Sequence, residues 1–129
     1  MKLHSAVFYS KDLTPLKELY VDFLGATVER ETAGKFISFM FENGVRLGIK
    51  VGDKEREVGG HGTIFVEVVG IETWYQKAVE TKRTIYKPLT IQPWAKSFSI
   101  LDSDGNKVEF LEECKSSWRS QAKEFTRVE

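Results

Sequence analysis

Apolar residues follow two different spacings along the chain, and each change of spacing marks a new element. Residues 3–10 are mostly apolar, aromatic or β-branched, which predicts a largely buried strand. Pro15 follows a possible N-cap at Thr14, and Gly25 supplies a stop signal, so a helix is expected between them. Its apolar side chains share one helical face: Leu16, Leu19, Tyr20, Phe23 and Leu24.

Three shorter strand-like runs follow this helix, at residues 26–31, 35–42 and 45–51. Asn43-Gly44 separates the last two and is a strong short-range hairpin signal. The first part of the chain, about residues 1–51, is therefore expected to form a βαβββ module.

The same order of elements restarts after a charged, glycine-flanked connector at residues 52–60. A strand is expected at 61–69, a helix from Ile71 to about Val79, and strands at 84–86, 96–101 and 107–112. A proline-punctuated loop from Pro88 to Trp94 and a tight turn at 102–105 are expected between these strands. The second module would span about residues 61–112.

A final helix is expected over about residues 114–126, because Trp118, Ala122 and Phe125 share one helical edge. This edge would dock on the domain or form a dimer contact.

The predicted fold class is α+β, with residues 1–129 forming one domain around one core. Nineteen basic residues balance nineteen acidic ones, which argues against nucleic-acid and membrane partners. The chain has a single cysteine, Cys114, and no secretory signal or long apolar run. Together these features predict a soluble, cytoplasmic protein.

Three segments resemble the vicinal-oxygen-chelate superfamily, which includes glyoxalase I, bleomycin-resistance proteins and extradiol dioxygenases. They are KDL at residues 11–13, LYVDFLGA at 19–26 and DSDGNKVEFLE at 102–112. The resemblance covers about residues 3–112 and implies two βαβββ modules in a curved mixed sheet around a cavity. It also implies a small-molecule ligand and a homodimer.

Metal-binding members of this superfamily carry four ligands on the inner sheet. The resemblance places these four positions at Ser5, near Leu47, at Thr63 and at Glu109. Only Glu109 is a good ligand for a divalent cation, so no metal or other cofactor is expected. The alternative is a metal held by Glu109 and His61, because His61 shares the face of Thr63 while His4 points away from the cavity.

If the family register holds, strand alternation defines which side chains line the cavity. The lining residues would be Ser5, Val7 and Tyr9 on the first strand, Thr63, Phe65 and Glu67 on the fifth, and Lys107, Glu109 and Leu111 on the last. Trp94, in the loop, could stack on a planar ligand. The expected ligand-binding set is Ser5, Val7, Tyr9, Thr63, Phe65, Trp94 and Glu109.

Glu109 is also the candidate catalytic residue. Without a cation beside it, its pKa would be raised and it could accept a proton. Alternatively it forms an ion pair with Lys107, Arg46 or another cation.

Three functions remain open. The first is metal-independent binding of a small hydrophobic or aromatic molecule, similar to bleomycin-resistance proteins. The second is a divalent-metal-dependent glyoxalase-like lyase, isomerase or dioxygenase. The third is an interaction module whose cavity is filled by Phe39, Phe41, Phe65 and Trp94.

Overall fold

The computed structural model of the protein describes residues 1–113. Its chain forms two compact units. The first comprises Met1–Gly62 with Asp102–Asn106, and the second comprises Thr63–Leu101 with the strand that starts at Lys107. Each unit carries one complete βαβββ module, so the expected α+β class and the repeat are both confirmed. The expected C-terminal helix lies outside the described residues.

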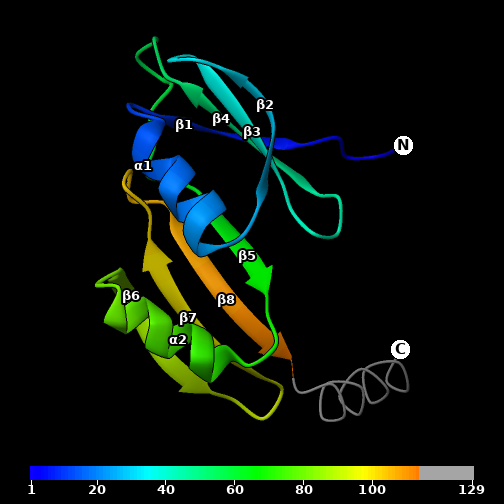
Figure 1. Ribbon diagram of the computed structural model, residues 1–129, viewed down its shortest axis with the longest axis vertical. Coiled ribbons are helices and arrows are strands. Elements are labelled where there is room, and N and C mark those ends of the chain that lie inside the picture. Colours follow the sequence, from blue (N-terminus) through cyan, green and yellow to red (C-terminus); the bar gives the residue numbers. More distant parts are fainter. Residues whose placement is uncertain (114–129) are drawn as a thin grey trace. The chain divides into compact units, whose positions relative to one another are not determined.

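The first unit is a four-stranded sheet with one helical segment on one face (Figure 1). Its elements are β1 (Ala6–Ser10), α1 (Thr14–Lys17), the π-helical segment η1 (Glu18–Phe23), β2 (Thr27–Thr32), β3 (Phe36–Met40) and β4 (Arg46–Val51). The strand order is β1-β4-β3-β2, with β1 parallel to β4 and the other pairs antiparallel.

The core of this unit lies between the helical segment and the sheet. The helix contributes Leu16, Leu19, Tyr20 and Phe23, and the sheet contributes Ile37, Phe39, Leu47 and Ile49, all buried. The expected helical face is confirmed except for Leu24, which is only half-buried. It follows a π-helical turn, in which the Leu24 N–H donates to the Leu19 carbonyl at 2.9 Å.

The turn Asp102–Asn106 belongs to the first unit and is tied into it by a buried amide. Asn106 Oδ1 accepts hydrogen bonds from the Gly60 N–H at 3.1 Å and the Gly62 N–H at 2.8 Å. Asp102 in turn accepts from the backbone and side-chain N–H groups of Asn106. The turn predicted here is therefore also an anchor for the glycine-rich end of the connector.

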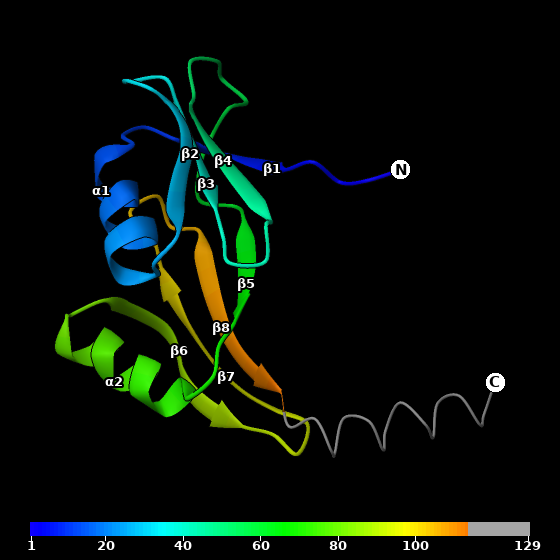
Figure 2. The same ribbon diagram turned by 45° about the vertical axis from the view of Figure 1, so that its right-hand side comes forward.

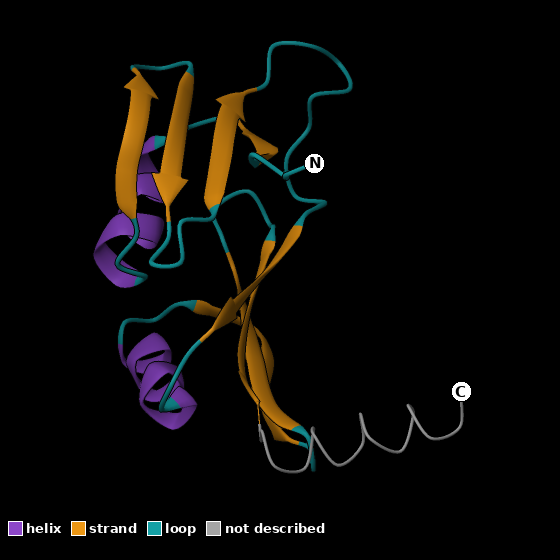
Figure 3. Ribbon diagram, turned by 90° about the vertical axis from the view of Figure 1, so that its right-hand side faces the viewer, coloured by secondary structure: helices purple, strands orange, loops and turns teal. Residues whose placement is uncertain are grey.

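The second unit repeats the arrangement, with one helix across one face of a four-stranded sheet (Figures 2 and 3). Its elements are β5 (Thr63–Glu67), α2 (Ile71–Glu80), β6 (Thr84–Ile91), β7 (Ala95–Leu101) and β8 (Lys107–Glu113), in the sheet order β5-β8-β7-β6. Phe98 and Phe110 stack with their ring centroids 4.4 Å apart, and Tyr75 of α2 packs on Phe98 at 5.0 Å. The faces of β7 and β8 that carry these rings therefore point toward α2.

The loop expected from Pro88 to Trp94 is wrong in extent. β6 continues through Pro88 to Ile91, and only residues 92–94 form the turn. Because β6 is an edge strand, a proline without an N–H can be tolerated there. The pairing of β6 with β7 also shifts between Ile85 and Lys87 and between Lys87 and Thr90, which accommodates the irregularity.

One strand boundary and one turn conformation also differ from expectation. β1 begins at Ala6 rather than at residue 3, so Ser5 precedes the strand. The hairpin at Asn43-Gly44 has a positive φ at Gly44 alone (+81°), which is not the double left-handed turn that Asn-Gly favours.

Among the described residues, no helix is long and apolar enough to cross a membrane.

Candidate functional site

The second sheet has one face that α2 does not cover, here called the open face. Register pairs Thr63 with Lys107, Phe65 with Glu109 and Glu67 with Leu111. Because Phe98 and Phe110 point toward α2, alternation directs the neighbouring residues of β7 and β8 to the open face. Its residues on these three strands are Thr63, Phe65, Glu67, Ser97, Ser99, Leu101, Lys107, Glu109 and Leu111. The face predicted from alternation for β5 and β8 is confirmed.

An ion pair stands at the centre of the open face. Lys87 Nζ of β6 lies 2.9 Å from Glu109 Oε2 and 3.1 Å from Ser97 Oγ. The expectation of a Glu109 carboxylate without a cation is therefore wrong. The alternative of an ion pair is the one found, and its cation is Lys87 rather than Lys107 or Arg46.

The hydroxyl of Ser99 lies in the same row of the sheet. Ser99 is paired in register with Glu109 on one side and with Lys87 on the other. It is 1% exposed, and its Oγ has no hydrogen-bond partner among the described residues. A buried hydroxyl without a partner costs about 1–3 kcal/mol.

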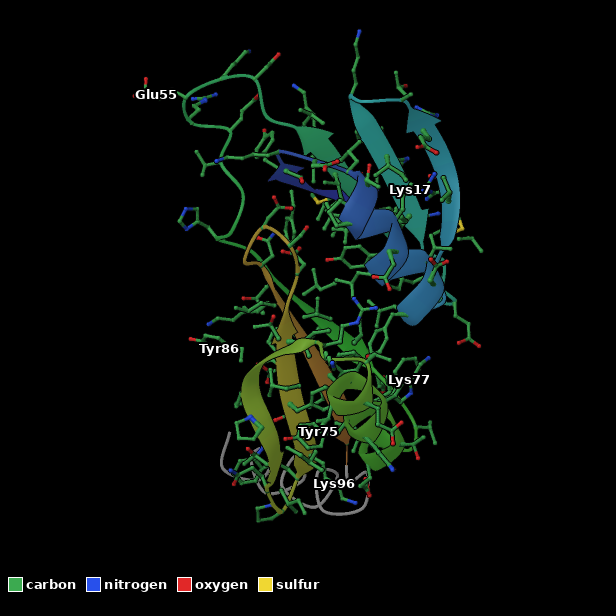
Figure 4. All side chains as sticks on the ribbon, turned by 60° about the vertical axis from the view of Figure 1, so that its left-hand side comes forward. Lys17, Glu55, Tyr75, Lys77, Tyr86 and Lys96 are labelled. Carbon is green, nitrogen blue, oxygen red and sulfur yellow. The ribbon has the colours of Figure 1, made fainter. Side chains whose placement is uncertain are left out.

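Two aromatic side chains flank the ion pair and remain exposed. Phe65, opposite Glu109 in register, is 67% exposed, and Tyr86 of β6 is 56% exposed. Lys107 Nζ lies 4.5 Å from the centroid of the Tyr86 ring. Figure 4 shows Tyr86 pointing away from α2, whereas Tyr75 lies between α2 and the strands. The open face thus combines aromatic surface with a few fixed charges.

Trp94 lies in the short turn between β6 and β7 and is 42% exposed. The loop in which it was expected to lie is only three residues long. A stacking role for its ring stays a prediction.

The first sheet presents a different face. Gly48 pairs with Val7 and Ser38, as Glu109 pairs with Phe65 and Ser99 in the second sheet. A Cβ at Gly48 would lie 3.1 Å from the ring of Phe36 and 3.3 Å from Val7, so these side chains cover the position. The first-unit counterpart of Glu109 is therefore a glycine.

Leu47 itself does not lie on the face where the ligand position near it is expected. Leu47 is 4% exposed and pairs with Phe39 in the core beneath the helical segment. Alternation then places Gly48, not Leu47, on the face away from the helix.

The first sheet has its own ion pair. Arg46 Nε lies 2.6 Å from Glu29 Oε2, and Ser38 Oγ donates to Glu29 Oε1 at 3.3 Å. The hydrogen bond from Arg46 is the main cause that lowers the pKa of Glu29. Arg46, which was one of the expected partners of Glu109, is thus paired within its own unit.

The remaining predicted residues of the first unit lie along and before β1. Val7 is exposed and Tyr9 half-buried on the strand, and the Ser5 hydroxyl contacts His4 Nδ1 at 3.2 Å. His61 is exposed and precedes β5. Their roles in ligand or metal binding stay predictions.

A metal site would need several ligands close together. Within residues 1–113, no group of three or more His, Cys, Asp or Glu side chains is placed to hold a metal ion. Glu109 already has the Lys87 ammonium as its neighbour, so as a metal ligand it would have to share its carboxylate.

Two functional candidates were missed by sequence reasoning. Lys87 lies between the strand expected at 84–86 and the loop expected from Pro88, and Ser99 is one of two serines in the strand expected at 96–101. The available signal was strand alternation. Ser97 and Ser99 alternate with the apolar Phe98 and Ile100 and therefore share the opposite face of the strand.

The chain matches the family model described as "Glyoxalase superfamily protein" over residues 6–117. It belongs to the glyoxalase superfamily, which is the vicinal-oxygen-chelate superfamily that the sequence motifs resemble. No curated protein matches the chain.

Solved structures agree on the fold. Lactoylglutathione lyase from Agrobacterium tumefaciens is 17% identical, with a TM-score of 0.70 over 86% of this chain and 92% of that one. The fosfomycin resistance protein FosX from Mesorhizobium loti is 15% identical, with a TM-score of 0.66 over 86% and 91%. A glyoxalase/bleomycin resistance protein/dioxygenase from Alicyclobacillus acidocaldarius is 20% identical, with a TM-score of 0.66 over 91% and 95%. At these identities the likeness establishes the fold and leaves the chemistry open.

Proposed function

We propose that the protein binds a small, partly aromatic molecule on the open face of the second sheet, without requiring a metal. The observation that carries this proposal is the Lys87–Glu109 ion pair, with exposed Phe65 and Tyr86 around it. Small-molecule sites typically combine apolar and aromatic surface with a few placed polar groups. The open face has both components.

The aromatic part of the ligand would contact Phe65. The Phe65 ring is two-thirds exposed. A ligand that covers it would bind favourably, because each Å² of buried apolar surface contributes about 25 cal/mol. The polar part would meet the Lys87–Glu109 ion pair, whose side chains are 39% and 19% exposed. Such a ligand would cover the exposed ring and contact the ion pair beside it.

The two alternative functions have less support. A filled cavity would need Phe65 and Trp94 to be packed inward, but both are exposed, so they do not fill the interior of their unit. A metal-dependent lyase, isomerase or dioxygenase has the support of a family that includes enzymes and rests on Glu109 and His61. Because Glu109 is held by Lys87, binding is the better-supported function.

The expected homodimer and cytoplasmic location remain part of the proposal. They rest on the family resemblance and on the balanced charge of the chain, and the dimer is tested by sedimentation equilibrium.

The test of the binding function compares two exposed apolar residues. Titration calorimetry would measure the dissociation constant for 1-naphthalenemethanol, a neutral aromatic probe, on the wild type, Phe65→Ser and Val69→Ser. Val69 is 90% exposed just beyond β5, so it controls for a general loss of surface hydrophobicity. Loss of one aromatic contact should weaken binding about fivefold in Phe65→Ser. Binding that is equal in both variants, or absent from the wild type, contradicts the proposal.

A further inference from the structure

We infer that the bound molecule is an aromatic anion whose acidic group pairs with Lys107. This inference rests on the proposed function and adds the charge of the ligand to it. It follows from how the charges of the open face are distributed along β8 and β5.

On the open face, paired residues of β5 and β8 form three successive rows. Neighbouring rows are about 7 Å apart, because alternate residues of a strand share a face. The middle row holds Phe65 and Glu109, and Lys87 neutralises this carboxylate at 2.9 Å. The row on one side holds Thr63 and Lys107. Any charge available to a ligand therefore comes from the outer rows.

Lys107 is a cation without an acidic partner. It has no ion pair with a carboxylate among the described residues of its unit, and its ammonium lies over the Tyr86 ring. A cation–π contact holds the ammonium in place but does not neutralise it. Its N–H groups can still donate to a ligand oxygen.

The opposite row has the opposite charge. It holds the exposed Glu67, which is paired in register with Leu111. Glu67 lies four residues from Thr63 along β5, or about 13 Å. A ligand anion is thus attracted to the Lys107 end and repelled from the Glu67 end, which fixes its orientation.

Aromatic surface lies beside the cation. Tyr86 contacts Lys107 directly, and Phe65 is one row away on the neighbouring strand. A planar molecule of one or two rings is long enough to place a carboxylate or sulfonate at Lys107 while its ring covers Phe65. Aromatic acids have this combination of groups.

The experiment uses three naphthalene probes whose single substituent is an anion, a neutral alcohol or a cation: 1-naphthoate, 1-naphthalenemethanol and 1-naphthylmethylamine. Their dissociation constants are measured by calorimetry on the wild type, Lys107→Gln and Lys96→Gln. Lys96 is the matched control, since it lies on the same sheet but pairs with Glu72 of α2 on the covered side. Wild-type protein should bind naphthoate more tightly than the alcohol and the alcohol more tightly than the amine.

Lys107→Gln should weaken naphthoate binding about fivefold, as for an exposed charge pair, and leave the alcohol unchanged. Lys96→Gln should change neither. If naphthoate and the alcohol bind equally and Lys107→Gln affects neither, the inference fails while the binding function stands. Preferred binding of the amine also overturns it and moves the charged contact to Glu67. If no probe binds, both fail.

Discussion

Glu112 of β8 caps the N-terminus of α2, although the two are 41 residues apart in sequence. Its Oε1 accepts a hydrogen bond from the Ile71 N–H at 3.1 Å, and its Oε2 accepts one from the Gly70 N–H at 3.0 Å. The N-cap residue, Gly70, has a φ of +74° and no side chain that could accept a hydrogen bond from these N–H groups. These two backbone hydrogen bonds lower the pKa of Glu112.

Replacing this carboxylate should destabilise the second unit. We expect Glu112→Ala to lower the free energy of unfolding by about 1 kcal/mol, the usual cost of losing a helix cap. Urea unfolding followed by circular dichroism measures it. Glu113→Ala is the control, because its side chain points to the other face of β8. An equal loss in both variants would contradict the capping role.

The same contact predicts a pH dependence. Because the pKa of Glu112 is lower in the folded than in the unfolded protein, its contribution is present above the ordinary value of 4.5 and is lost as pH falls through the lowered folded pKa. Asp102 acts in the opposite direction, since burial raises its pKa and protonation then favours the folded state. The difference in unfolding free energy between the wild type and Glu112→Ala isolates the first effect. It should shrink from pH 7 to pH 3, and a constant difference would be evidence against it.

The buried amide of Asn106 should be far more sensitive than an exposed one. Asn106→Ala removes the acceptor for two backbone N–H groups and the donor to Asp102, so we expect a loss of about 3 kcal/mol in unfolding free energy. Asn43→Ala, in an exposed turn, should cost less than about 0.5 kcal/mol. Similar losses at the two positions would show that the turn is not an anchor.

The local sequence pattern was sufficient to predict the two βαβββ modules and which residues of β5 and β8 share a face. Alternation of apolar and polar residues specifies which way each side chain points, and the pairing of Phe65 with Glu109 agrees with it. It could not identify Lys87, because Pro88 signals a loop unless the strand is known to be an edge. It could not identify the cap at Ile71 either, because Glu112 reaches α2 only through sheet pairing. The sequence also could not distinguish Leu47 from Gly48, since a one-residue shift reverses the face.

Whether the purified protein contains a metal ion can be measured directly. Elemental analysis of protein purified without chelator should find no stoichiometric metal, and Glu109→Ala and His61→Ala should be no different. The physical reason is that Lys87 already occupies the Glu109 carboxylate. Stoichiometric zinc, nickel, iron or manganese that disappears in either variant would restore the metal-dependent enzyme.

The central claim is that the open face of the second sheet is the binding site. Amide chemical-shift mapping of the labelled wild type with the three naphthalene probes tests it most directly. We predict that the largest shifts fall on β5, β7 and β8 around Phe65, Ser99 and Glu109. Shifts confined to other parts of the chain, or no saturable shifts with any probe, would contradict it.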